Sequence, residues 1–123
     1  MYANHRGGDG GRLYFDGSSI VCVNGKLVAQ ASQFSLIDVE VILATIDLDD
    51  IRSYRHGCKS FQEHSSITLD RPLNIVDIDF KLSCTCGPVS PPITPRLHSP
   101  EEECALGPAC WLWDYLRRSG AAG

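Results

Sequence analysis

Few residues in this sequence have types and spacing that could support catalysis or ligand binding. The glycine-rich stretch Gly7–Gly11 suggests a phosphate-binding loop. A dinucleotide-binding fingerprint starting at Gly8 would need a third glycine where Leu13 stands, and no predicted strand precedes it. Gly25-Lys26 is followed by Leu27, where a P-loop requires serine or threonine. The stretch is therefore interpreted as a surface loop whose glycines accept unusual backbone angles.

The cysteines do not form a recognisable metal site. There are six, at positions 22, 58, 84, 86, 104 and 110, and Cys84-Thr85-Cys86 is the only close pair. A structural zinc site usually draws on two such pairs, so His98, or Cys104 with Cys110, could complete one only by accident of folding. Residues 1–11 resemble neither a signal peptide nor a transit peptide. We therefore expect reduced, structural cysteines and a cytoplasmic protein, with Cys22 buried in an apolar run.

Histidines and aspartates show no catalytic or metal-binding spacing either. His5, His56, His64 and His98 are scattered, and none lies in an HExxH motif. Three aspartates (Asp47, Asp49 and Asp50) lack the spacing of a calcium loop and are interpreted as caps of a short helix. The residues themselves predict no catalytic, cofactor-binding or metal-binding side chain in this chain, and so indicate no enzyme.

Length and composition limit the class of protein. The chain has 123 residues, a formal charge of −4, 43% hydrophobic residues and 21% charged residues. This length is typical of one domain, and the composition argues against a disordered chain. The mild acidic balance gives no reason to expect nucleic acid as a partner. No apolar run approaches the ~20 residues that a membrane helix needs, so no membrane span is predicted.

The N-terminal half is predicted to be rich in strands. After a glycine-rich loop over residues 1–17, the apolar segments Ser18–Val23 and Lys26–Ser32 flank Asn24-Gly25. Both residues of this pair tolerate the positive φ of a type I′ turn, so the three segments predict a hairpin. Asp38–Leu48 is apolar on both faces of a strand, which predicts a strand covered on both sides.

The middle of the chain carries weaker signals. The short polar segment Asp49–Arg55 predicts one or two helical turns, and residues 57–71 lack any period and predict a loop. Leu73–Leu82 alternates apolar and polar residues, as in a half-exposed edge strand. Residues 84–98 contain four prolines and are interpreted as a linker.

A helix is predicted from Ser99 to residue 119. Ser99 is placed as N-cap, Pro100 as the first helical residue and Glu102 as the third, which together form a capping box. Gly107-Pro108 should break or kink this helix, and Gly120 should stop it. Its last turns carry an apolar stripe at helical spacing, formed by Trp111, Leu112, Tyr115 and Leu116.

Several stretches of the sequence resemble glutamine-dependent NAD synthetases. The N-terminal ones are Tyr2-Ala3-Asn4, Arg12-Leu13-Tyr14, Asp16-Gly17, Gln30–Leu36, Asp38–Val41 and Ile51–Arg55. The C-terminal ones are His98–Glu103 and Leu106–Ser119, with its double tryptophan and double arginine. Residues 57–76 and 85–97 match poorly.

The resemblance implies a place within a longer enzyme. That family joins a nitrilase-type glutaminase, which uses a Glu–Lys–Cys triad, to an ATP-dependent synthetase domain that amidates deamido-NAD. Residues 1–83 would be the C-terminal portion of the glutaminase, a carbon-nitrogen hydrolase domain. Residues 84–98 would be the linker, and residues 99–119 a helical arm leading towards the synthetase. The implied fold class is α/β, a partial nitrilase-like αββα sandwich with that C-terminal helical arm.

The resemblance assigns no catalytic residue to this chain. The chain would begin after the triad and stop before the ATP-binding loop, so ATP, magnesium, glutamine and deamido-NAD would belong to the parent enzyme. We therefore expect a fragment that is inactive alone. The alternatives are a non-catalytic module that associates with full-length synthetase subunits, or a small metal or redox protein that uses its cysteines.

Overall fold

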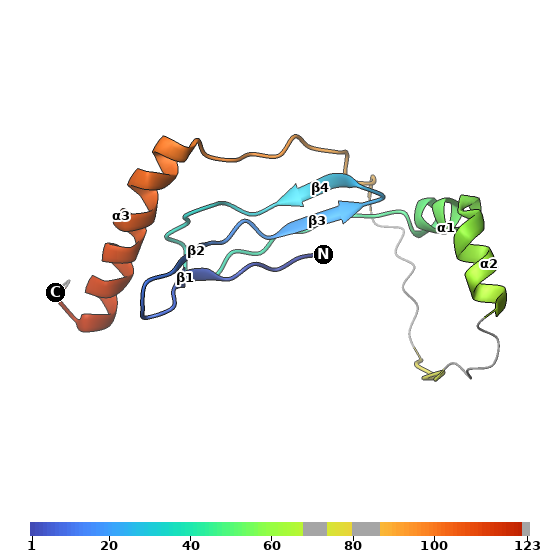
Figure 1. The fold of residues 1–123 in the computed structure, drawn as a ribbon, viewed down its shortest axis with the longest axis horizontal. Helices are drawn as coiled ribbons and strands as arrows, with labels where there is room; N and C mark the ends of the chain where they lie inside the picture. Colours follow the sequence, from blue (N-terminus) through green and yellow to red (C-terminus); the bar gives the residue numbers. More distant parts are fainter. Residues whose placement is uncertain (68–73, 80–86, 122–123) are drawn as a thin grey trace. The chain divides into compact units, whose positions relative to one another are not determined.

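The structure is a computed structural model that describes residues 1–67, 74–79 and 87–121 (Figure 1). The chain divides into two units, one formed by Met1–Ala44 with Ser90–Gly123 and the other by Thr45–Val89. Within the described residues, the first unit holds two hairpins and a long helix, and the second holds two short helices. This mixture of strands and helices fits the predicted α/β class.

The N-terminal segment folds into a short hairpin. Strand β1 (Arg6–Gly8) pairs antiparallel with β2 (Tyr14–Asp16). The carboxylate of Asp9 accepts hydrogen bonds from the amides of Gly11 (2.8 Å) and Leu13 (3.1 Å), which close the turn and lower the pKa of Asp9. The prediction of a continuous loop over residues 1–17 was therefore wrong. Three-residue strands containing glycines are too short to show the alternation that marks a strand.

The second hairpin confirms the one predicted around Asn24-Gly25. Strand β3 (Ile20–Val23) pairs antiparallel with β4 (Lys26–Gln30). Between them Asn24 and Gly25 have φ angles of 48° and 79°, as a type I′ turn requires.

Cys22 is exposed in this hairpin, whereas the sequence predicted it to be buried. The register shifts between Val21 and Cys22, and the hairpin is a two-stranded sheet. In the part of the chain that the structure describes, no second sheet covers the side of β3 that carries Cys22. An apolar strand is buried only where another layer packs on it.

The segment predicted as a doubly covered strand, Asp38–Leu48, contains no strand; instead, helix α1 begins at its last residue. Val39, Val41 and Leu43 are 77%, 74% and 86% exposed, while Ile42 and Ala44 on the other side are half-buried. A strand exists only through hydrogen bonds to a neighbouring strand. No described segment pairs with this one.

The second unit contains helix α1 (Leu48–Gly57) and helix α2 (Lys59–Ile67). The first was predicted as a short helix over Asp49–Arg55, and Asp47 caps it by accepting a hydrogen bond from the amide of Asp49 (2.8 Å). The second contradicts the loop predicted over residues 57–71. No residue of α2 is buried, and a helix of nine residues is too short for a lone apolar face to be recognised against the polar residues around it.

The two remaining middle segments are irregular where they are described. Residues 74–79 contain no strand, and the rest of the predicted strand Leu73–Leu82 lies outside the described residues. Residues 87–98 contain neither helix nor strand, and part of them lies along β4. There the amide of Ile93 donates to the carbonyl of Leu27 (2.8 Å).

Helix α3 (Pro100–Ser119) begins and ends as predicted. The hydroxyl of Ser99 accepts from the amide of Glu102, the carboxylate of Glu102 accepts from the amide of Ser99, and Gly120 closes the helix with a φ of 70°. The helix runs through Pro108, where a break or kink was predicted. Pro108 removes one hydrogen bond, but it lies on an exposed side of the helix where water can hydrate the freed carbonyl.

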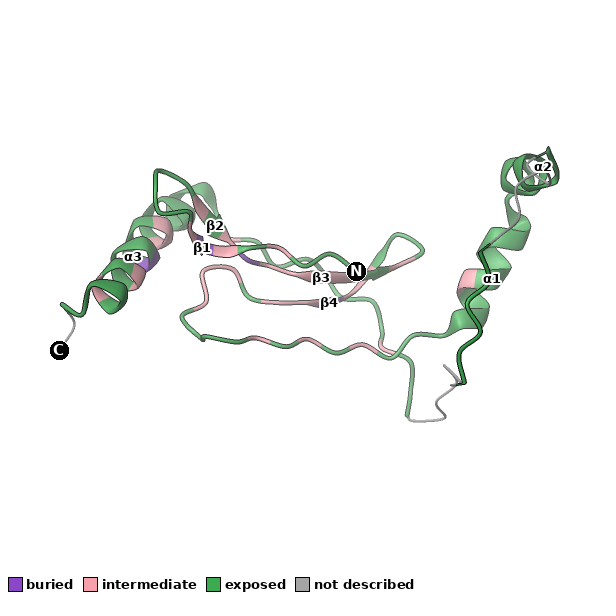
Figure 2. Ribbon diagram, turned by 90° about the horizontal axis from the view of Figure 1, so that it is seen from below, coloured by how far each residue is buried: buried purple, intermediate pink, exposed green. Residues whose placement is uncertain are grey.

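Burial is sparse in the described residues (Figure 2). Ala29 and Cys110 are the buried hydrophobic residues among them. No described helix has the length and apolar character needed to cross a membrane.

Candidate functional site

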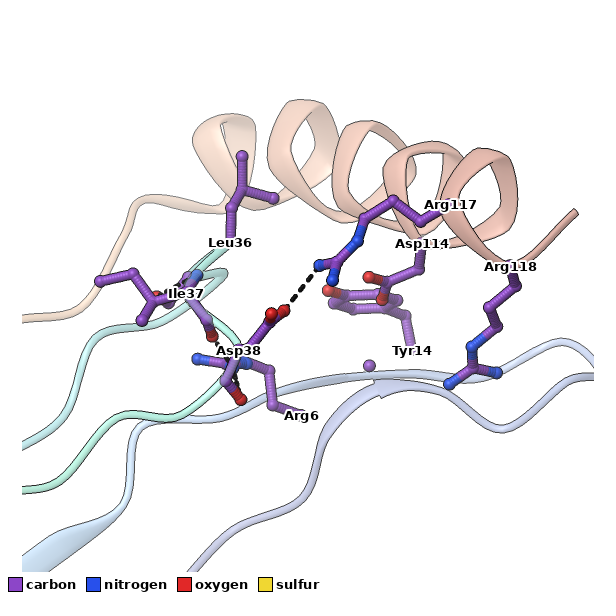
Figure 3. Close-up of a pocket in the computed structure, with 10 residues that line it drawn as sticks. Arg6, Tyr14, Leu36, Ile37, Asp38, Asp114, Arg117 and Arg118 are labelled. Carbon is purple, nitrogen blue, oxygen red and sulfur yellow. Dashed lines mark hydrogen bonds and ion pairs between the residues drawn. The ribbon is translucent and has the colours of Figure 1, made fainter. Parts of the chain in front are cut away.

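A charged cleft lies between the N-terminal hairpin, the segment 35–38 and the last turns of α3 (Figure 3). Its volume is about 340 Å³. The ionisable side chains that line it are Arg6, Tyr14, Asp38, Asp114, Arg117 and Arg118. Three elements that are distant in sequence therefore supply one cluster of charged side chains.

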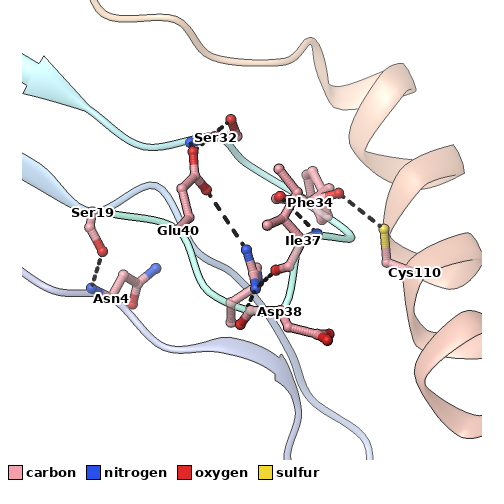
Figure 4. A network of polar contacts seen from close by, with 10 residues as sticks. Asn4, Ser19, Ser32, Phe34, Ile37, Asp38, Glu40 and Cys110 are labelled. Atoms are coloured by element: carbon pink, nitrogen blue, oxygen red, sulfur yellow. Dashed lines mark hydrogen bonds and ion pairs between the residues drawn. The ribbon is translucent and has the colours of Figure 1, made fainter. Parts of the chain in front are cut away.

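Arg6 holds the segment 37–40 against the N-terminal hairpin. Its guanidinium donates to the backbone carbonyls of Ile37 and Asp38 and lies 3.7 Å from the carboxylate of Glu40. The same Glu40 accepts hydrogen bonds from the amide and the hydroxyl of Ser32, both at 3.0 Å (Figure 4). The side chains of Arg6 and Glu40 are only 22% and 23% exposed, so this ion pair is the least hydrated one described.

Arg117 reaches the same segment from α3. Its guanidinium donates to the carboxylate of Asp38 at 2.7 Å. This hydrogen bond and the charge of Arg117 lower the pKa of Asp38 and raise that of Arg117. Because the two side chains are 71% and 43% exposed, the pair contributes less to stability than its short distance suggests.

Tyr14 lines the cleft and interacts with the buried Cys110 of α3. Burial raises the pKa of Tyr14 to about 12, with smaller contributions from Cys110 and Asp114, so its hydroxyl is neutral at physiological pH. The ring of Tyr14 stacks on Phe34 with centroids 6.2 Å apart. The buried thiol of Cys110 donates to the carbonyl of Phe34 at 3.4 Å (Figure 4).

A second polar network joins the N-terminal hairpin to the start of α3. Asp16 accepts hydrogen bonds from the side-chain amides of Asn4 (3.0 Å) and Gln33 (2.8 Å). Gln33 also accepts from the backbone amide of His98 (2.9 Å) and donates to Glu103 (3.3 Å). Gln33 thus connects the hairpin to both the segment before α3 and the first turn of that helix.

Hydrogen bonds around the cleft join segment 35–38 to the N-terminal hairpin and to α3. Arginines, a neutral tyrosine and two carboxylates are described around it, without an activated nucleophile. Cys110 is only 5% exposed and its thiol is hydrogen-bonded to a backbone carbonyl. In this part of the chain the arrangement holds α3 in place.

The residues that the sequence singled out do not come together. Cys22, Cys58 and Cys104 are exposed and free, and Cys84 and Cys86 lie outside the described residues. The pKa of Cys58 is lowered, chiefly by its hydrogen bond to the Ser60 hydroxyl. Among the described residues, no group of three His, Cys, Asp or Glu side chains could hold a metal ion.

Sequence reasoning missed the charged residues that build the cleft. Arg6, Asp38 and Glu40 come from segments predicted as a loop and a strand, and only folding brings them together. In the sequence Arg117 stands out only as part of the double arginine near the end of the predicted helix. No spacing in the sequence indicated that it would reach Asp38.

Comparisons with known proteins show what the chain is similar to. Residues 1–56 match the carbon-nitrogen hydrolase family. The whole chain aligns with the human glutamine-dependent NAD(+) synthetase at 52% identity over 126 residues. It also aligns with the Saccharomyces cerevisiae enzyme at 47% over 129 residues and the Arabidopsis thaliana enzyme at 50% over 128 residues. The chain is homologous along its whole length to glutamine-dependent NAD(+) synthetases.

The homology covers only part of those enzymes. The chain spans 18% of the human and yeast glutamine-dependent NAD(+) synthetases and 17% of the Arabidopsis one. The carbon-nitrogen hydrolase match contains both hairpins and the segment that Arg6 holds, and α3 lies beyond it. The charged cleft therefore joins residues inside that match to residues outside it.

Proposed function

We propose that this chain is a connecting segment of a glutamine-dependent NAD(+) synthetase, in which α3 is an arm fixed to the end of the glutaminase domain. The parent reaction would be the ATP-dependent amidation of deamido-NAD with ammonia from glutamine. Residues 1–83 would contribute the final part of an αββα sandwich, residues 84–98 the linker and residues 99–119 the arm. The observation that carries this proposal is the sequence identity of about half to such synthetases along the whole of this chain.

The contacts of α3 support the role of an arm that keeps a fixed orientation. Gln33, Phe34 and Asp38 contact the first, middle and last turns of the helix. A helix held at three points along 20 residues transmits the position of one domain to whatever follows it more faithfully than a free linker.

We also propose that the chain alone hydrolyses no glutamine. The buried thiol of Cys110 donates to the carbonyl of Phe34, and the thiol of Cys58 is hydrogen-bonded to the hydroxyl of Ser60, which is not a general base. The test is ammonia release from glutamine by the purified chain and by six variants, each with one Cys→Ser change. We expect no release above a heat-treated blank. Release that one Cys→Ser change abolishes would contradict this proposal.

A second candidate function is association with full-length synthetase subunits. It is favoured by the extended segment around Val39, Val41 and Leu43, whose apolar side chains are largely exposed. Mixing the chain with a full-length synthetase and measuring co-sedimentation tests it. We expect Val41→Asp to abolish co-sedimentation and Val76→Asp, at an equally exposed valine of the other unit, to leave it unchanged. Equal loss in both variants, or no co-sedimentation of the unmodified chain, would exclude a specific contact.

A further inference from the structure

Three side-chain hydrogen bonds join one face of helix α3 to the segment 33–38. Glu103, Cys110 and Arg117 are spaced by seven residues, about two helical turns, and so lie on the same side of the helix. Their partners all lie between residues 33 and 38, at distances of 3.3, 3.4 and 2.7 Å. This face is therefore occupied along the whole helix.

A second face of α3 is apolar and exposed. Ala105, Ala109, Leu112 and Leu116 follow one another at spacings of four, three and four residues, the repeat of a helix–helix packing seam. We call these four residues the outer seam. Ala105 and Ala109 are exposed, Leu112 is 50% exposed and Leu116 is half-buried. At about 100° per residue, the outer seam is centred roughly 130° around the helix from Glu103, Cys110 and Arg117.

Large aromatic residues border the outer seam. Trp113 and Tyr115 are 44% and 58% exposed, one on each side of it. Together with the seam they make a continuous apolar surface on one side of α3. Surfaces of this kind on a helix usually mark a protein–protein contact.

We propose that the outer seam pairs antiparallel with the outer seam of a second copy of this chain. A two-fold axis halfway between Ala109 and Leu112 places Ala109 of one copy opposite Leu112 of the other. The same axis places Ala105 opposite Leu116. Every layer of the contact then joins a small residue to a large one, which lets the two helices approach closely and interdigitate.

The charges of α3 favour the same orientation. Glu101, Glu102 and Glu103 lie in its first turn and Arg117 and Arg118 in its last. Antiparallel pairing brings the acidic end of each helix to the basic end of the other and opposes the two helix dipoles. Parallel pairing would gather the glutamates of both copies at one end and would leave layers of alanine against alanine.

Sedimentation equilibrium of the full chain and four variants tests this pairing. We expect the unmodified chain to form a dimer. Leu112→Ala should weaken it at least about tenfold, because the alanine leaves a hole opposite Ala109. Ala109→Leu should weaken it similarly, because two leucines then meet in one layer. The double variant Ala109→Leu/Leu112→Ala should restore the dimer, since small and large residues again oppose each other.

Tyr54→Ala serves as the matched control. Tyr54 is 66% exposed in the second unit, and its removal should leave the dimer unchanged. Far-UV circular dichroism of each variant checks that α3 stays helical. A chain that stays monomeric up to about 1 mM would overturn the proposal. A dimer that the single changes leave intact would also overturn it. The same holds if the double variant dimerises more weakly than either single variant.

Discussion

At the scale of residues, two guanidinium groups organise the charged cleft from opposite sides. Arg6 holds the backbone of segment 37–40, and Arg117 holds the carboxylate of Asp38. Their environments differ, because Arg6 is about half as exposed as Arg117 (22% against 43%). Removing one partner of a desolvated ion pair leaves a buried charge unpaired and costs much stability. Removing one partner of a hydrated pair costs little. Arg6 should therefore matter more to the fold than Arg117.

We predict that replacing Arg6 loosens segment 37–40 more than replacing Arg117. Arg6→Ala removes the donors to two carbonyls and leaves Glu40 without its cationic partner. Amide hydrogen exchange in this segment should accelerate by roughly fivefold to 150-fold, as expected for a loss of about 1–3 kcal/mol. Arg117→Ala is the matched control and should accelerate it less. Equal effects of the two changes would contradict this ranking.

We predict that the contact between Asp38 and Arg117 weakens in acid. The folded-state pKa of Asp38 lies below its ordinary value of 3.8. Its ionised form therefore stabilises the folded chain above about pH 4, and this stabilisation is lost as pH falls through the folded-state pKa. The measurement is amide exchange in the last turns of α3 between pH 2.5 and 6, after correction for intrinsic rates. In Asp38→Asn this acid-dependent component should disappear, and its persistence would contradict the assignment.

We predict that Tyr14 ionises late in an alkaline titration. Its pKa of about 12 exceeds the ordinary value of 10.0, mainly because its hydroxyl is partly buried. The stabilisation it contributes should thus be present below about pH 10 and be lost as pH rises towards 12. The difference between the absorbance titrations of the unmodified chain and Tyr14→Phe isolates this residue. A difference curve with its midpoint near pH 10 would show that the ring is not buried in solution.

At the scale of elements, local signals at the ends of α3 are strong enough to define it. Ser99 and Glu102 satisfy backbone donors of the first turn, and Gly120 adopts the left-handed conformation that ends the helix. Pro108 lies inside the helix, away from both ends. Helix α2 lacks such a box and has no buried residue. The two helices therefore depend to very different degrees on their own sequence.

We predict that Ser99→Ala frays the start of α3. Loss of an N-cap costs about 1 kcal/mol, equivalent to roughly fivefold faster exchange of amides in the first turns. Ser53→Ala, in the middle of α1 and away from its N-cap Asp47, is the control and should change little. Unchanged exchange at residues 102–104 in Ser99→Ala would show that contacts such as Gln33 with Glu103 hold the helix start instead.

At the scale of the whole molecule, few of the described hydrophobic residues are buried. Ala29 and Cys110 are the buried hydrophobic residues among those described, while Val39, Val41 and Leu43 remain exposed. Burial of apolar surface is the main favourable term in folding. Many of the described contacts between distant segments are polar hydrogen bonds and ion pairs rather than buried apolar packing.

We predict a broad unfolding transition in urea. The m-value scales with the surface exposed on unfolding, so it should fall below the range of about 1–3 kcal/mol/M found for small proteins. The midpoint should rise with protein concentration if two copies pair through the outer seam. The Leu112→Ala variant should remove that concentration dependence. A sharp transition that is independent of concentration would indicate a cooperative core that the described contacts do not contain.

The sequence by itself determined the elements whose signals are local. The Asn24-Gly25 turn, the caps of α1 and α3 and the end of α3 at Gly120 each depend on the backbone preferences of a few neighbouring residues. The sequence likewise carried the resemblance that the comparisons confirm. Patterns of this kind can be read without knowing what lies across the fold.

Only the tertiary structure decided which side chains meet and which faces are covered. Asp38 contacts Arg117 although 79 positions separate them along the chain. The segment after Asp38 was predicted as a buried strand from its apolar residues, yet no described strand pairs with it. A strand and a charged cleft both need partners that are distant in sequence. Residue types alone do not determine which distant segments lie next to each other in the fold.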